Sequence, residues 1–257
     1  MTSKHSFSLE LIDYAINLIK NRSALEKDNT INQVDLKRLK TYTIDNDDTF
    51  EIDDALSLES INNTYRIWIH ISCPSIYIPF NSILDKEARK RAATIYYVDK
   101  TETMFPEILI HEILSLTQNK DKKCISVGVE LNNDGSIANT IINQTTININ
   151  YNLTYDDANE LIELSPKEDK QLEILFNLLK LRQQWRLKEG AITIDEIRGQ
   201  PSLENNKMSI KYIEPSKARF IVSESMVLIG SAVAEFCYKN LIPIPFRCQD
   251  RNRKEYN

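Results

Sequence analysis

The sequence TIDNDDTFEIDDALSLE, from Thr43 to Glu59, concentrates negative charge in a stretch that also contains hydrophobic residues. Six acids lie between positions 45 and 54: Asp45, Asp47, Asp48, Glu51, Asp53 and Asp54. No Lys or Arg occurs between positions 41 and 65. Because the hydrophobic residues among the acids favour burial, this stretch is predicted to be part of a packed structure rather than a free acidic tail.

Carboxylates that lie close together repel one another, and they stay ionised together only if a cation sits among them. An all-oxygen site favours a hard divalent ion such as Mg²⁺, which would point to phosphoryl chemistry. A calcium EF-hand is excluded, because the sixth position counted from Asp45 is Phe50 and the twelfth is Leu56. No Cys or His spacing fits zinc. A solvated acidic loop without a metal remains the alternative.

The composition indicates a soluble globular protein. The chain has 257 residues, 42% hydrophobic and 27% charged, which allows a substantial core in one large domain or two small ones. We expect no membrane segment, since no apolar run approaches the roughly 20 residues that span a bilayer. The N-terminus lacks the apolar region of a secretory signal. Four cysteines without a CxxC pair favour a reduced cytoplasmic protein.

The net charge of −5 argues only weakly against a nucleic-acid-binding protein, because the distribution of charge matters more than its sum. Basic residues cluster at 86–91, 120–123 and 247–254, away from the acidic stretch. The five glycines form neither a P-loop nor a GxGxxG motif, so no nucleotide cofactor is expected.

Hydrophobic periodicity predicts both helices and strands. Helices are expected over 7–20, 84–93, 167–188 and 217–239, the last with Ser216 as its N-cap. TYRIWIHI alternates as a strand, and CISVGVEL is followed by an NNDG turn and a returning strand, which predicts a hairpin. The pattern favours an α+β fold with an antiparallel or mixed sheet and packed helices.

The acidic stretch resembles the opening motif of the ribonuclease II catalytic domain, called the RNB domain. RIWIHISCPSIYIP is similar to the strand-and-turn segment of that family, and LDKEARKRAATIYYVDKTETMFPEIL to its LDxEAxxR…YLP…MxP block. Later family blocks resemble LSLTQ, NLTYDD, WRLKEGAITI and IVSESMVLIGSAVAE. Order and spacing agree from about Asp35 to Arg247. MFPEIL and IPIPFRCQ are most similar to the cyanobacterial and plastid branch. The resemblance implies a helical lead-in at 1–40 and an RNB catalytic domain at 41–257.

The resemblance implies a 3′→5′ exoribonuclease that hydrolyses single-stranded RNA to nucleoside 5′-monophosphates with Mg²⁺. The catalytic, metal-binding carboxylates would be Asp45, Glu51, Asp53 and Asp54. Asp45 and Asp54 would be direct ligands, and Asp53 would be the acid most critical to turnover.

Three further residues occupy family positions near the RNA: Tyr96, Tyr155 and Glu224. Asp47 and Asp48 match no catalytic position and are expected to be solvated. The expected protein is a cytoplasmic monomer, or a plastid protein in a photosynthetic eukaryote.

Three departures from the family keep other hypotheses open. Glu51 stands where the family commonly has Asp, and its extra methylene would turn a direct contact with the ion into a water-mediated one, so we expect activity only if Glu51 is an outer ligand. Cys73 stands where many members have Asp, and a thiol does not replace that charge. The chain stops before a family segment whose Arg contacts the scissile phosphate and before an OB-fold module, so the domain is expected to be incomplete at its C-terminal end. The alternatives are a catalytically impaired RNA-binding fragment or pseudoenzyme, and an incomplete product that does not fold stably.

Overall fold

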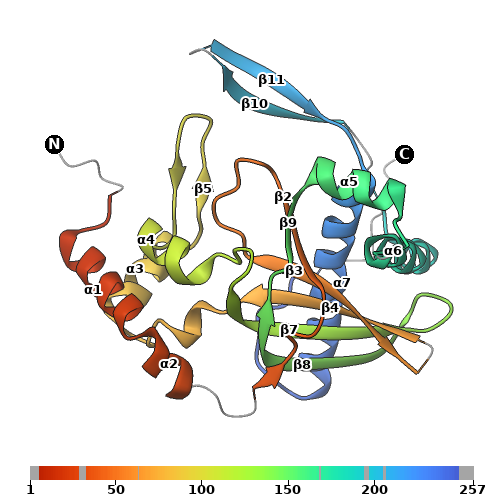
Figure 1. Ribbon diagram of the computed structural model, residues 1–257, viewed down its shortest axis with the longest axis horizontal. Helices are drawn as coiled ribbons and strands as arrows, with labels where there is room; N and C mark the ends of the chain where they lie inside the picture. Colours follow the sequence, from red (N-terminus) through yellow and green to blue (C-terminus); the bar gives the residue numbers. More distant parts are fainter. Residues whose placement is uncertain are drawn as a thin grey trace.

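The centre of the fold is a seven-stranded mixed sheet (Figure 1). The structure is a computed structural model that describes residues 6–28, 33–62, 64–167, 169–193, 197–204 and 207–248. In spatial order the strands are β1 (Val34–Asp35), β8 (Ile137–Asn148), β7 (Asp121–Leu131), β4 (Thr64–Ser72), β3 (Asp54–Ile61), β2 (Thr41–Asp45) and β9 (Tyr151–Thr154). Neighbours are antiparallel except β1 with β8 and β2 with β9. The predicted α+β class with a mixed sheet is confirmed.

Three helices cover one face of the sheet: α5 (Tyr155–Leu164), α6 (Gln171–Lys188) and α7 (Lys217–Lys239). Ile67 and Ile69 of β4 are buried in the same cluster as Leu175 of α6. α7 contributes buried residues such as Ala218 and Leu228 to the same cluster. Burial of each large aliphatic side chain stabilises the fold by about 1.5–3 kcal/mol.

A second hydrophobic core lies beside the sheet and contains Ala15, Leu84 and Leu109. Its elements are α1 (Leu9–Lys20), α2 (Arg22–Asp28), η1 (Pro74–Ile76), α3 (Ile83–Arg91), α4 (Glu107–Leu109) and η2 (Ile110–Leu114). Two small hairpins complete the described chain: β5 (Ile95–Tyr96) with β6 (Thr101–Glu102), and β10 (Arg198–Glu204) with β11 (Lys207–Ile213). Both hairpins extend beyond the sheet toward the top of Figure 1.

Most predicted elements are present, with shifts at their ends. The helix predicted over 217–239 is α7, and the hydroxyl of Ser216 accepts a hydrogen bond from the Arg219 N–H at 3.3 Å, as an N-cap does. The prediction over 167–188 was wrong at its start, because α6 begins at Gln171. The preceding helix α5 was missed.

α7 also corrects the expectation about apolar runs. Among the described residues, α7 is the one helix that is long and apolar enough to cross a membrane. It contacts α5, α6, β7 and β8, and its buried residues belong to the main core. We therefore interpret α7 as a core helix.

A row of buried polar side chains crosses five strands on the sheet face opposite α7. Thr41 and Ser57 are hydrogen-bonded at 2.8 Å, and the Ser57 hydroxyl lies 2.9 Å from Nε2 of His70. Nδ1 of His70 lies 2.6 Å from the hydroxyl of Ser126, which lies 2.5 Å from that of Thr145. All five residues are fully buried. Burial lowers the pKa of His70 to about 3, so its imidazole is neutral at physiological pH.

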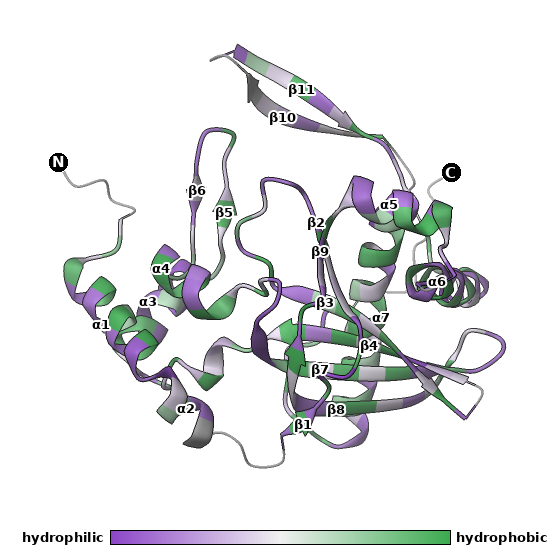
Figure 2. Cartoon of the chain, viewed as in Figure 1, coloured by the Kyte–Doolittle hydropathy of each residue, from purple (hydrophilic) through white to green (hydrophobic). Residues whose placement is uncertain are grey.

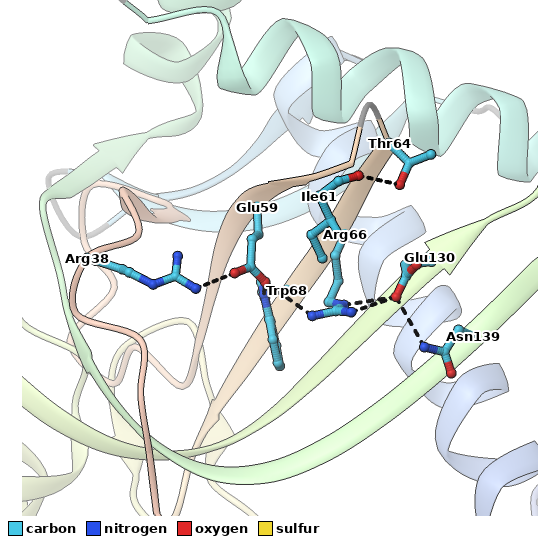
Figure 3. Close-up of polar contacts among 8 residues, drawn as sticks. All are labelled: Arg38, Glu59, Ile61, Thr64, Arg66, Trp68, Glu130 and Asn139. Atoms are coloured by element: carbon cyan, nitrogen blue, oxygen red, sulfur yellow. Dashed lines mark hydrogen bonds and ion pairs between the residues drawn. The ribbon is translucent and has the colours of Figure 1, made fainter.

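A second polar network closes the far end of β3, β4 and β7 (Figure 3). The carboxylate of Glu59 accepts hydrogen bonds from Arg38, from Arg66 at 3.3 Å and from Nε1 of Trp68 at 2.9 Å. Arg66 also donates to Glu130 at 2.7 Å. Burial alone would raise the pKa of Glu59, but the hydrogen bonds and charges of these partners outweigh it and hold the pKa below its usual value.

His70 predicts a pH dependence of stability. Between about pH 6.5, the pKa of an exposed histidine, and its folded pKa of about 3, the unfolded chain binds a proton that the folded chain excludes. The free energy of unfolding is therefore unaffected by this proton above about pH 6.5, and it falls by about 1.4 kcal/mol for each pH unit below that value. The stability advantage of the unsubstituted chain over His70→Gln should therefore shrink from pH 7 to pH 4 in urea unfolding. Parallel curves for the two proteins would contradict this account.

Candidate active site

The acidic residues lie where β2 ends and β3 begins. Asp45 is the last residue of β2 and Asp54 the first of β3, and the two strands are paired antiparallel. The loop 46–53 between them is mainly hydrophilic, with the hydrophobic residues Phe50 and Ile52 among its polar ones (Figure 2). The carbonyl of Asp53 accepts a hydrogen bond from the Ser72 N–H at 2.8 Å, which ties the loop to the end of β4.

Hydrophobic residues within the loop fix its path. Ile52 donates its N–H to the hydroxyl of Ser115 at 3.1 Å and accepts a hydrogen bond from the Leu116 N–H at 2.9 Å. Phe50 packs edge-on against His111, with ring centroids 4.6 Å apart. The alternation of acids with Phe50 and Ile52 therefore holds the carboxylates at defined positions.

Three carboxylates have raised pKa values. Burial, followed by the charges of Asp54 and Asp53, raises the pKa of Asp45 to about 7. Asp53 is exposed at the edge of a pocket, but the surrounding protein, followed by the charges of Glu51 and Asp54, raises its pKa to about 6. Burial also raises the pKa of Asp54. These acids are thus close enough to repel one another.

Their chemistry fits a hard divalent cation, which would remove this repulsion. In the described chain no three Asp, Glu, His or Cys side chains converge closely enough to identify a metal centre from their positions alone. The fit therefore rests on the all-oxygen donor set and on the raised pKa values. Asp45 and Asp54 are the residues that would hold the ion directly, with Asp53 beside them.

Glu51 points toward a neighbouring segment. Its carboxylate accepts a hydrogen bond from the Thr94 hydroxyl at 2.8 Å, and that hydroxyl accepts one from the Met104 N–H at 3.0 Å. Thr94 immediately precedes the β5–β6 hairpin, which carries Tyr96. Glu51 thus links the acidic loop to this hairpin, and sequence reasoning missed Thr94 because the contact depends on tertiary packing.

Tyr96 lies beside the acids. Its side chain is 64% exposed. Burial of part of the ring, then the charges of Glu51, Asp53 and Asp45, raises its pKa. Tyr96 lines a pocket of about 780 Å³ together with Glu51, Asp53 and the buried Cys73. This pocket therefore joins an aromatic surface to the acidic loop.

Tyr155 approaches the acids from another side. β9 runs parallel to β2 with Thr154 opposite Asp45, so Tyr155, the next residue, begins α5 at the same edge of the sheet. Burial, then the charge of Asp45, raises the pKa of Tyr155, while the nearby Arg219 opposes this rise. The guanidinium carbon of Arg219 lies 4.0 Å from the centroid of the tyrosine ring.

Glu224 lies deeper in the fold. It is 3% exposed, and its carboxylate accepts two hydrogen bonds from Arg186 of α6, at 2.8 and 2.6 Å. Glu224, Arg186 and Tyr155 line a second pocket, of about 400 Å³. The buried glutamate thus has the partner that its apolar helix requires. Asp47 and Asp48 are exposed.

The Thr94 contacts predict a loss of stability on removal of the hydroxyl. Thr94→Val leaves the Glu51 carboxylate and the Met104 N–H without this partner, so the free energy of unfolding should fall by about 1 kcal/mol or more. Thr94→Ser keeps the hydroxyl and is the matched control. Urea unfolding of both variants measures the difference, and equal stability would show that the hydrogen bonds contribute nothing.

Comparison with known proteins shows the family. The RNB domain matches residues 33–257. An uncharacterised ribonuclease of Synechocystis is 37% identical over 217 residues, 84% of this chain and 33% of that protein. Chloroplastic/mitochondrial ribonuclease II of Arabidopsis thaliana is 34% identical over 229 residues, 86% of this chain and 28% of that protein. The similarity to these two proteins confirms the predicted cyanobacterial and plastid branch.

Among solved structures, RNase R of Mycoplasma genitalium, solved with ribose-methylated single-stranded RNA, has a TM-score of 0.87 at 22% identity, covering 96% of this chain and 39% of that one. The chain spans about a third of the length of the relatives it matches. It belongs to the RNB domain family.

Proposed function

We propose that this chain is the catalytic part of an exoribonuclease that removes nucleoside 5′-monophosphates from the 3′ end of single-stranded RNA with Mg²⁺. The ribonuclease names of the relatives support RNA as the substrate. The single observation that carries the proposal is the set of mutually repelling acids, Asp45, Asp53 and Asp54, with Tyr96 and Tyr155 beside them.

In the proposed reaction, the three aspartates and Tyr96 have separate roles. A bound Mg²⁺ would activate a water and neutralise charge on the scissile phosphate. Asp45 and Asp54, at the ends of paired strands, would hold it, and Asp53 at the pocket edge would orient the attacking water. The exposed ring of Tyr96 would stack on a terminal base, an interaction of about 1–3 kcal/mol that suits any sequence.

A second candidate function is RNA binding without turnover. It is favoured by Glu51, whose carboxylate accepts a hydrogen bond from Thr94, and by Cys73, which places a thiol rather than a carboxyl group in the same pocket. Both functions share the RNA site, so they differ only in whether the bound RNA is cut.

We expect a single-stranded RNA labelled at its 5′ end to be shortened progressively when Mg²⁺ is present. Asp53→Asn should reduce the rate at least about 100-fold, because metal-assisted charge stabilisation is worth several kcal/mol and each 1.36 kcal/mol is a factor of ten. Gel analysis of the RNA and chromatography of the released nucleotides measure the reaction.

Asp47→Asn is the matched control, since it removes the same charge from an exposed position of the same loop. It should retain most of the activity. RNA that is bound but stays intact would support the second candidate, and RNA that is neither bound nor cut would contradict both.

A further inference from the structure

Arg219 joins three parts of the candidate site. It lies in the first turn of α7, where its N–H is bonded to the cap residue Ser216. Its guanidinium carbon is 4.0 Å from the ring centroid of Tyr155. Its Nη2 donates to Oδ1 of Asn46 at 3.3 Å, and Asn46 directly follows Asp45. The side chain is half-buried, so it is held in place without being removed from solvent.

The first turn of α7 is an unfavourable place for a cation. The amino end of a helix carries partial positive charge, and acidic rather than basic residues stabilise it. The first turn of α7 has no acidic residue but contains both Lys217 and Arg219. Lys217 lies 4.0 Å from a carboxylate oxygen of Glu163, and Glu214 lines the same pocket as Arg219. The guanidinium of Arg219, beside the helix end, is therefore the group of this turn that would attract an incoming anion.

The Arg219 guanidinium borders the acidic loop. Tyr155 lies within electrostatic reach of Asp45 and Asp54 as well as of Arg219. Arg219 and Tyr155 also line the pocket of about 400 Å³ that contains Glu224 and Arg186, a volume in the range of ligand sites. A polyanion whose end reaches the acids would therefore pass the guanidinium.

The chemistry of the side chain identifies the group it would take. A guanidinium offers planar, paired donors that match the oxygens of a phosphate. Because Arg219 already covers one face of the Tyr155 ring, that face presents a charged donor rather than a bare aromatic surface. The ring holds the guanidinium plane by a cation–π contact.

We propose that Arg219 binds a backbone phosphate of single-stranded RNA beside the acidic loop, with Tyr155 and Asn46 fixing its orientation. This inference rests on the proposed function. It gives the guanidinium of Arg219, in the first turn of α7, a direct contact with the RNA. The competing explanation is that Arg219 only braces α7 against Tyr155 and the loop.

The salt dependence of RNA binding separates these two roles. Each phosphate contact with single-stranded nucleic acid contributes about 0.7 to the slope of log affinity against log salt concentration. Binding of a fluorescent single-stranded RNA to the full chain is measured by anisotropy between about 50 and 200 mM salt. EDTA is present, and a gel verifies that the RNA stays intact.

Arg219→Gln should weaken binding and reduce the slope by about 0.7, to a similar extent for RNAs of different sequence. Arg219→Lys keeps the charge and should keep the slope. Lys239→Gln is the matched control, because it removes one exposed positive charge at the other end of the same helix, about 30 Å away. Its slope should equal that of the unsubstituted chain.

An unchanged slope in Arg219→Gln would overturn the proposal and leave the bracing role. The same would follow if Arg219→Lys lost as much of the slope as Arg219→Gln. Failure of the unsubstituted chain to bind RNA would contradict the proposed function itself and this inference with it. Far-UV circular dichroism verifies that each variant is folded.

Discussion

The placement of Asp45, Asp53 and Asp54 close to one another, each partly desolvated by the surrounding protein, is the constraint on which the candidate site depends. In the unfolded chain Asp45 is free to move away from Asp53 and Asp54. In the folded chain the paired strands β2 and β3 hold the three acids near one another at their ends. Desolvation, followed for Asp45 and Asp53 by the charges of neighbouring acids, raises their pKa values and so opposes ionisation when no cation is bound. A divalent ion would bind the ionised carboxylates and stabilise their charged form, so that protons would be released when the ion binds.

The rest of the fold keeps the acids together. Burial of the β2–β3 pair beneath α5, α6 and α7 fixes the register of the strands, and the hydrogen bonds of Ile52 fix the loop between them. The parallel pairing of β9 with β2 brings Tyr155 to the same edge. Rigid strands thus determine the acidic positions, while the β5–β6 hairpin and the first turn of α7 supply the groups around them.

The acids were predictable because they lie in one short motif whose alternation with Phe50 and Ile52 indicates burial. Tyr96 was placed by resemblance alone, since its own sequence context does not distinguish it from a core tyrosine. Thr94, Arg186 and Arg219 were not predicted as site residues, because each acts through a partner 38 or more positions away in the chain. The basic residues in the first turn of α7 were the available signal for Arg219.

Calorimetric titration with Mg²⁺ tests the central claim most directly. If the ion replaces protons on Asp45 and Asp53, binding near pH 6.5 should release protons, and binding near pH 8.5 should release almost none, as the heats in buffers of different ionisation enthalpy would reveal. The double variant Asp45→Asn, Asp54→Asn should not bind. Absence of binding by the unsubstituted chain, or equal binding by the double variant, would contradict the account.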